Sequence, residues 1–190
     1  MRLRTPKDRI WLLASLGVLI IAAAILLWMG REPICKCGYV KLWHGETMSS
    51  ENSQHLSDWY TPSHIGHGLI FYAALWLVAR RLSFGARLAI ATVVEAAWEV
   101  IENTDAVINH YRSVTISLDY YGDSVLNSVA DIGAMWLGFW LASRLPVAAS
   151  IALLVGMELF VGWMIRDNLA LNILMLLWPL ESVRAWQGGG

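Results

Sequence analysis

The residues of this sequence with the clearest chemical potential are acids and imidazoles that lie inside apolar segments. Glu95, Glu99 and Glu102 follow one another at spacings of four and three, which stacks them on one face of a helix over about 10.5 Å. Ionisable groups at membrane depth cost several kcal/mol unless they are paired, neutralised or bound to an ion. This helix face is therefore a candidate site.

Two further segments carry patterns of the same kind. Asp123, Asn127 and Asp131 recur every four residues, again on one helix face. The stretch SHIGHG places His64 and His67 three residues apart, which brings both imidazoles to one side of a helix. Three separate elements must therefore position these groups if they form one site.

Two chemistries are compatible with the cluster. Imidazole and carboxylate ligands suit a divalent Zn, Mn or Fe ion, and the expected metal ligands are His64, His67, Glu99, Glu102 and Asp123. Alternatively, a buried carboxylic acid beside a histidine works as an acid/base pair, with Glu99, Asp123, His64 and His67 as the catalytic candidates. The sequence does not decide between them, because neither HExxH nor a Glu-x-x-His motif is present.

A structural role is the alternative to both chemistries. Polar side chains join membrane helices at about 0.6 to 2 kcal/mol each, and Asn127 or the isolated Glu158 can serve in this way. Helix association needs only one or two such groups, so it explains the whole set poorly. The remaining members of the polar cluster are Glu95, Asn127, Asp131 and Glu158.

The composition indicates the elements that carry these groups. Of the 190 residues, 57% are hydrophobic and 15% charged, and the mean hydropathy is +0.50, whereas a soluble domain has about 25% charged residues. The net charge of −1 and scattered basic residues exclude nucleic acid as a partner class. We expect an all-α integral membrane helical bundle in a bacterial inner membrane, with lipids as its surroundings.

Apolar runs predict about six transmembrane helices in a single domain over residues 1–190. An uncleaved first helix is preferred to a signal peptide, because its run of twenty residues is long and lacks a small-x-small site. The thirteen residues of Asn168–Leu180 suit either a short sixth span or a re-entrant helix. The other five expected spans are Ile10–Met29, Ser63–Ala79, Leu88–Ile101, Asp123–Leu141 and Pro146–Ile165.

Basic residues predict a cytoplasmic N-terminus. Nine Lys or Arg fall on the expected inner side, Arg184 among them, against five on the outer side. Loops at about 30–62 and 102–122 then face the periplasm. This topology brings the His pair, Glu99, Glu102, Asp123 and Asn127 into the outer half of the bilayer, with Glu95 and Asp131 about one to two turns deeper.

The first outer loop contains both cysteines of the chain. Cys35 and Cys37 lie in what should be an oxidising compartment, where a simple disulfide is the leading interpretation. A CxC pair can also ligate a soft metal, with His44 or Met48 as further ligands, or act as a labile redox pair. It is not a haem attachment site, which needs CxxCH.

Several motifs together resemble a family of uncharacterised bacterial multi-pass inner-membrane proteins. They are CxCG after the first apolar run, SHxxHG at 63–68, EAxWExxEN at 95–103 and YGDSxxNSxxD at 121–131. The resemblance covers about residues 10–165. It implies a helical membrane protein and brings no established activity.

A weaker likeness links the sequence to VanZ-like membrane proteins. It implies a shared helical core and nothing about a substrate. The chain departs from that pattern in three places, namely the wide gap between Asp58 and His64, the additional His67, and Ala130 at a glycine position. The matching positions are Asp58, His64, Glu99, Asp123, Asn127 and, loosely, Gly133 and Gly138.

The sequence favours a membrane protein whose polar site opens to the outer face and binds or acts on a lipid-linked or envelope substrate. One alternative is an accessory subunit whose polar residues hold a larger membrane complex together. The third is ion or proton translocation, but Ile132–Leu141 has no ionisable group to continue a path. Whether the chain is an enzyme stays open at this point.

Overall fold

The computed structural model describes residues 6–189, and all regular structure in that range is helical, which confirms the all-α fold class. The basic residues Arg2 and Arg4, which support the predicted orientation, lie outside the described residues. The helices are α1 (Pro6–Trp28), α2 (Thr61–Val78), α3 (Phe84–Glu102), α4 (Asp105–Val114), α5 (Val125–Ala142), α6 (Val147–Ile165), α7 (Leu169–Leu177) and α8 (Glu181–Gln187).

Five of these helices have 18 to 23 residues, or about 27 to 35 Å at the α-helical rise. Three segments are both long and apolar enough to cross a membrane, namely Asp8–Trp28, Val125–Ala142 and Val147–Ile165. α2 and α3 are as long but more polar, since they carry the histidines and the glutamates. The helices indicate a membrane-associated protein, and they do not confirm a bundle of six spans.

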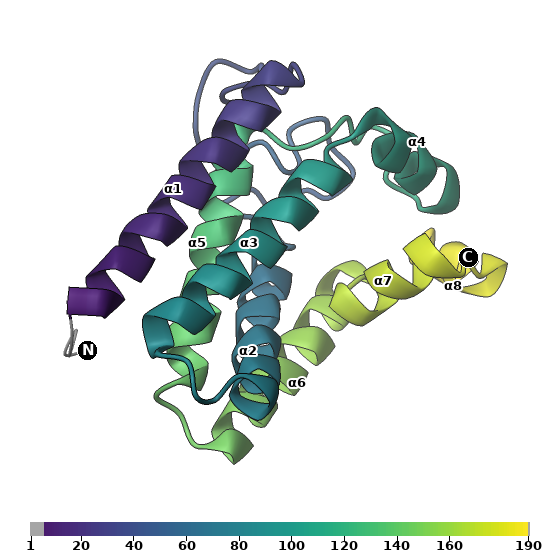
Figure 1. Cartoon of the computed structure of the whole chain (residues 1–190). Coiled ribbons are helices and arrows are strands. Elements are labelled where there is room, and N and C mark those ends of the chain that lie inside the picture. Colours follow the sequence, from purple (N-terminus) through teal and green to yellow (C-terminus); the bar gives the residue numbers. More distant parts are fainter. Residues whose placement is uncertain (1–5, 190) are drawn as a thin grey trace.

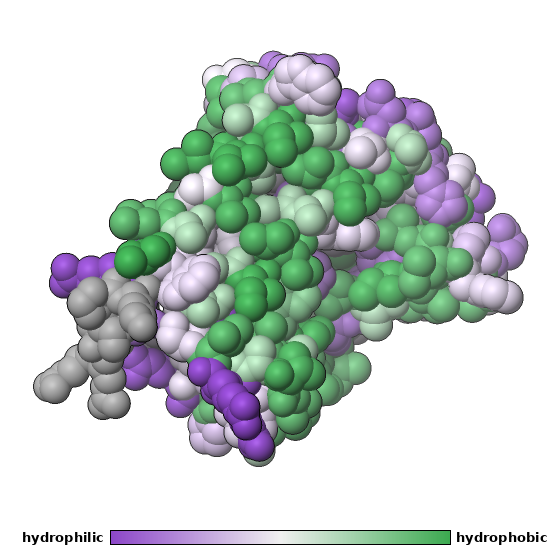
Figure 2. Space-filling model, viewed as in Figure 1, coloured by the Kyte–Doolittle hydropathy of each residue, from purple (hydrophilic) through white to green (hydrophobic). Residues whose placement is uncertain are grey.

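The surface agrees with this association. Figure 2 shows hydrophobic residues over the length of the helices, and hydrophilic ones gathered toward the ends of the bundle. Large apolar side chains stay exposed along α1 and α6, including Ile20, Leu159 and Trp163. Exposed apolar surface of this extent is typical of an interface with lipid.

Four of the long helices have one terminus each at the same end of the bundle. α1 and α3 finish there and α2 and α5 begin there, together with the loop of residues 29–60 and α4 (Figure 1). Backbone hydrogen bonds fix this end, because Val125 N donates to Glu32 O and Ser124 N donates to Ser53 O. The expected convergence of the polar residues therefore has a structural basis.

The packing of α2 against α5 is close enough to exclude side chains at one crossing. A Cβ atom at Gly68 would overlap the carbonyl oxygen of Met135, and one at Gly138 would overlap the carbonyl oxygen of Ile65. Next to this crossing, Met135 and Phe139 form a buried core with Leu88 of α3. The two glycines let α2 and α5 approach with backbones in contact.

The C-terminal segment differs from the expected sixth span. α7 has nine residues, about 14 Å, which is too short to cross a bilayer. It contacts α4, where His110 Nε2 lies 2.9 Å from Leu176 O. α8 approaches the end of the second loop near Ile116. Arg184 therefore lies near α4, not at the opposite end with the basic residues of the expected inner side.

The second predicted outer loop also contains more structure than expected. Residues 105–114 form α4. Thr104 is its N-cap, and the Thr104 side chain accepts a hydrogen bond from Val107 N. Thr104 and Asp105 are favourable residues for a helix start. This short helix escaped the analysis of apolar runs because its apolar residues are interspersed with polar ones and form no continuous run.

Candidate functional site

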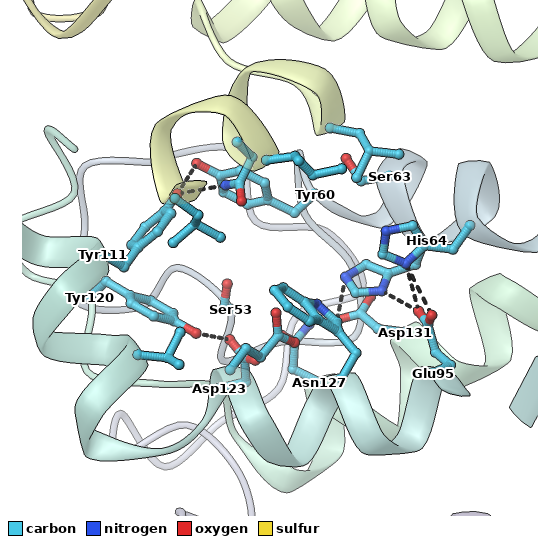
Figure 3. Close-up of a pocket in the computed structure, with 18 of the residues that line it drawn as sticks. Ser53, Tyr60, Ser63, His64, Glu95, Tyr111, Tyr120, Asp123, Asn127 and Asp131 are labelled. Carbon is cyan, nitrogen blue, oxygen red and sulfur yellow. Dashed lines mark hydrogen bonds and ion pairs between the residues drawn. The ribbon is translucent and has the colours of Figure 1, made fainter. Parts of the chain in front are cut away.

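Most of the polar residues predicted from sequence line one cavity of about 370 Å³ between α2, α3, α5, α4 and α7, and Glu99 lies buried behind this lining. Figure 3 shows their side chains arranged around a central space, with Tyr60 and His64 on one side and Asp123 and Asn127 on the other. Polar groups therefore converge from elements far apart in the sequence. The lining also includes His67, Glu95, Glu102, Tyr111, Tyr120, Asp131 and Asn172.

Glu95 contacts both histidines of α2. Its carboxylate lies 2.7 Å from Nδ1 of His64 and 3.0 Å from Nδ1 of His67. A carboxylate only accepts hydrogen bonds, so this arrangement puts a proton on Nδ1 of each ring, and in the neutral form of the ring Nε2 has a free lone pair. Histidines that ligate metals are oriented by a carboxylate in the same way.

Glu99 and Asp131 also lie beside His64, Glu99 near the same Nδ1 that Glu95 contacts and Asp131 near Nε2. The distance from His64 Nδ1 to Glu99 Oε1 is 3.5 Å, and that from His64 Nε2 to Asp131 Oδ2 is 3.8 Å. Glu99 is 0% exposed, yet neither of its carboxylate oxygens accepts a hydrogen bond, and Asp131 Oδ1 is also buried without a partner. Such oxygens carry a large desolvation cost unless a proton or an ion compensates it.

Two neighbouring side chains hold Asp123, which lies two residues before the start of α5. Asn103 donates to Oδ2 at 2.8 Å and the Tyr120 hydroxyl donates to Oδ1 at 3.1 Å. The side-chain Oδ1 of Asn103 accepts from the backbone N–H of Asp123 at 2.7 Å. This reciprocal pair places Asp123 next to the last turn of α3.

The described residues offer three overlapping sets of metal ligands in this region, each with its ligand atoms within 4.8 Å of one another. His64 belongs to two sets and Glu99 belongs to two, so adjacent sets share a ligand. The unpartnered oxygens of Glu99 and Asp131 fit a bound cation. The sets are His64, His67 and Glu95; His64, Glu99 and Asp131; and Glu99, Glu102 and Asp123.

The predicted ligand list is thus present but grouped differently. Sequence reasoning placed Glu95 and Asp131 deeper than the histidines and left them out of the metal set. In the structure Glu95 contacts His64 and Asp131 lies beside it. The packing of α2 against α3 and α5 therefore places His64 at the same depth as these two acids. The helical period alone gives depth along one helix and does not give the crossing of its neighbour.

Two other members of the predicted cluster have structural contacts. Asn127 lines the cavity, and its Nδ2 donates to His55 O at 2.9 Å. Glu158 is not among the residues that line the cavity, and its carboxylate accepts from the backbone N–H groups of Leu169 and Ala170. It therefore caps the first turn of α7, where a negative charge is favourable.

The far wall of the cavity is made of residues that the sequence analysis missed. The Tyr60 hydroxyl donates to Asp167 Oδ2 at 3.2 Å, and Asn172 Nδ2 donates to the Tyr111 hydroxyl at 3.0 Å. Tyr60 and Asn172 come from segments about a hundred residues apart. No local sequence pattern predicts this wall. The aromatic residues in the loops were a signal that the loops contribute side chains to a site.

The cavity rim on the side of α2, α3 and α7 is apolar. Ile70, Val94 and Ile173 line the cavity and keep 43%, 49% and 46% of their surface exposed. Phe71 and Trp98 extend this lining. Polar groups therefore occupy the inner end of the cavity, and apolar side chains surround its opening.

The acid behind the tyrosine wall gives a testable pH dependence. Burial raises the pKa of Asp167 from its ordinary 3.8 to about 6, although Asn168 N and Tyr60 donate hydrogen bonds to it. A raised carboxyl pKa favours the fold at low pH, and this contribution is lost as the pH rises from 3.8 through 6. The full loss is about 3 kcal/mol, since one pKa unit is about 1.4 kcal/mol.

We expect the melting temperature of the protein in one detergent to fall between pH 4 and pH 6. Asp167→Asn should make that fall smaller, because an amide does not titrate. The exposed Asp119→Asn is the matched control and should keep it. If the melting temperature changed with pH equally in the wild type and in Asp167→Asn, the assignment of this pH dependence to Asp167 would be wrong.

The two cysteines form a disulfide between Cys35 and Cys37, in agreement with the leading interpretation of the CxC pair. Cys35 is buried. Met48, one of the expected additional ligands, is exposed on the loop surface. Glu51 and His55, which were not among the expected ligands, lie next to the pair instead.

Comparison with known proteins places the chain among relatives of unknown activity. The family described as "Protein of unknown function (DUF2585)" matches residues 26–189. The chain belongs to this family. Its expected membership of an uncharacterised bacterial family is confirmed.

Curated relatives of the DUF2585 chain carry the name UPF0314 protein. One from Paracoccus denitrificans (strain Pd 1222) is 72% identical over 174 residues, which cover 92% of this chain and 90% of the relative. Another from Rhizobium meliloti (strain 1021) is 60% identical over 183 residues, 96% and 93% of the two chains. No solved structure matches. The weaker likeness to VanZ-like proteins is not shown by these comparisons.

Proposed function

We propose that this protein is a membrane enzyme that uses divalent metal ions at the His/Glu/Asp cluster to act on the polar head of a lipid-linked substrate. The observation that supports this most is the buried Glu99 carboxylate, which has no hydrogen-bond partner and is shared by two of the three ligand sets. A carboxylate that only joins helices would have a donor on the neighbouring helix. A cation supplies what is missing.

The donor set fits zinc, manganese or iron, which accept mixed imidazole and carboxylate ligands. His64, Glu99 and Asp131 would hold one ion, and Glu99, Glu102 and Asp123 an adjacent one. Such ions polarise a phosphoryl or carbonyl oxygen and lower the pKa of bound water. Glu95 fixes both imidazole rings from behind and is a positioning residue in this scheme.

The cavity supports an amphiphilic substrate. Its polar end presents the hydroxyl oxygens of Tyr60, Tyr111 and Tyr120, which can accept hydrogen bonds from a head group while their protons are donated within the protein. Its apolar rim is able to accept the first methylenes of a hydrocarbon chain. A volume of about 370 Å³ is in the range of small-molecule sites and suits a head group rather than a whole lipid.

The accessory-subunit alternative rests on the two residues with structural contacts. Asn127 and Glu158 both bond to backbone groups of other segments, which is the behaviour of polar residues that hold helices together. This explanation does not extend to Glu99 or Asp131. Ion translocation is less favoured, since α5 has no ionisable group after Asp131.

Elemental analysis of the purified protein tests the proposal. We expect at least one equivalent of zinc, manganese or iron in the wild type, and a loss of most of it in His64→Ala/His67→Ala. His110→Ala is the control, because this exposed histidine lies outside all three ligand sets. Substoichiometric metal in the wild type, or unchanged metal in the double variant, would reject the metal centre.

The substrate class needs a second measurement. The protein in lipid nanodiscs is incubated with a total bacterial lipid extract, and the products are followed by mass spectrometry. A released head group that depends on Glu99 and disappears in Glu99→Gln supports the proposal. Metal binding without any change in the lipids would keep the metal centre and reject the lipid-linked substrate.

A further inference from the structure

A second group of metal-ligating side chains lies in the loop of residues 30–60, outside the cavity. Cys35, Cys37, Glu51 and His55 each present a ligand atom, and these atoms lie within 4.8 Å of one another. Two sulfurs, one imidazole and one carboxylate form a set that suits zinc or a softer ion. None of these four residues lines the cavity.

We infer that this loop is a thiol-dependent metal site: when the Cys35–Cys37 disulfide is reduced, the two thiolates, His55 and Glu51 bind a zinc-like ion. A dithiol reductant breaks the S–S bond and is itself oxidised to a disulfide, while two electrons and two protons pass to the cysteines. Metal binding then displaces the thiol protons. Oxidation of the pair by a disulfide reagent reverses the sequence and releases the ion.

The surroundings favour a divalent cation in the reduced state. Glu51 Oε2 already lies 2.6 Å from Lys41 Nζ and 3.0 Å from His55 Nε2. Reduction adds two thiolates, so the four ligands carry three negative charges against one positive charge on Lys41. A divalent ion neutralises the remainder, whereas the oxidised loop needs no ion because Lys41 balances Glu51.

The ligands are held before any metal arrives. His55 is buried at 1% exposure, its ring stacks on Tyr39, and its backbone carbonyl accepts from Asn127 of α5. Beside it, His44 is buried and its Nε2 has no hydrogen-bond partner. Binding through either ring nitrogen of His55 replaces one of its present hydrogen bonds, to Glu51 or to Lys41 N, so only a local change is needed.

Cobalt(II) tests the site, because thiolate ligands give it an ultraviolet charge-transfer band and tetrahedral geometry gives it strong visible absorption. We expect the charge-transfer band in the full-length protein after reduction and no such band in the oxidised protein, and reduction should increase the visible absorption. The cavity cluster has no sulfur ligand, so the charge-transfer band reports the loop alone. Its failure is thus distinguishable from failure of the proposed enzyme site.

Variants identify the ligands other than sulfur. We expect His55→Ala and Glu51→Gln to weaken cobalt binding at least tenfold, and the exposed Glu46→Gln in the same loop to leave it unchanged. Equal affinity in all three variants would overturn the proposal, since the thiols alone would then explain binding.

A measurement on the wild type covers the case in which a variant fails to fold. Zinc should slow the alkylation of Cys35 and Cys37 in the reduced native protein, and the slowing should disappear in denaturant. Alkylation at the same rate with and without zinc would also overturn the proposal.

Discussion

Alanine at Gly68 or Gly138 is expected to prevent stable folding. A Cβ atom at Gly68 would overlap Met135 O and lie 2.5 Å from the backbone nitrogen of Phe139, and one at Gly138 would overlap Ile65 O. The obstacles are backbone atoms, which cannot rotate away as a side chain can. The helices must then separate, and α2 would no longer hold the histidines against α3.

Gly133 provides the matched control for this prediction. It lies in α5 as well, but nothing is found within 4 Å of the position of its Cβ atom. Gly133→Ala should therefore leave the protein unchanged or stabilise it by up to about 1 kcal/mol, since alanine has the higher helix propensity. The yield of monodisperse protein and its melting temperature in detergent measure both effects. Normal folding of Gly68→Ala would show that the crossing is looser than described.

Glu99→Leu is expected to have opposite effects in the absence and presence of metal. Without metal, the variant should be more stable than the wild type by about 1 to 3 kcal/mol, because it removes a buried carboxyl group whose oxygens accept no hydrogen bond. With zinc or manganese added, the wild type should gain stability and the variant should gain much less, because two of the ligand sets lose a member. Head-group release should be abolished in the variant.

Glu158→Leu serves as the contrast, since this carboxylate caps α7 through Leu169 N and Ala170 N. It should lower the melting temperature whether or not metal is present, and leave the metal-induced gain intact. Thermal unfolding with and without chelator distinguishes the two residues. A Glu99→Leu variant that is destabilised in the metal-free form would instead assign Glu99 to helix association.

The sequence predicted the long helices well because their signal is local. The expected spans Ser63–Ala79 and Pro146–Ile165 differ from α2 and α6 by one or two residues at their ends. The short helices were less accessible. The apolar residues of α4 alternate with polar ones, and α7 occupies a run that composition alone assigns equally well to a short span or a re-entrant helix.

Helical spacing predicted part of the cavity lining, and it did not predict the contacts between the lining residues. Helical spacing identifies Glu95 and Asp131 as members of polar faces, but their approach to His64 depends on the angle at which α2 crosses α3 and α5. That angle follows from the contact at Gly68 and Gly138, which a single sequence does not reveal as a crossing point. The contribution of the loop, through Tyr60, depends likewise on the tertiary structure.

The apolar rim determines how a substrate of the proposed kind would be presented. Ile70, Val94 and Ile173 border the cavity and stay exposed on the side of the bundle, so a lipid can enter sideways from the bilayer. Its chains need not pass through water. The reaction then depends on the mole fraction of the lipid in the membrane plane and not on its bulk concentration. Dilution with an inert lipid should slow turnover at constant total substrate.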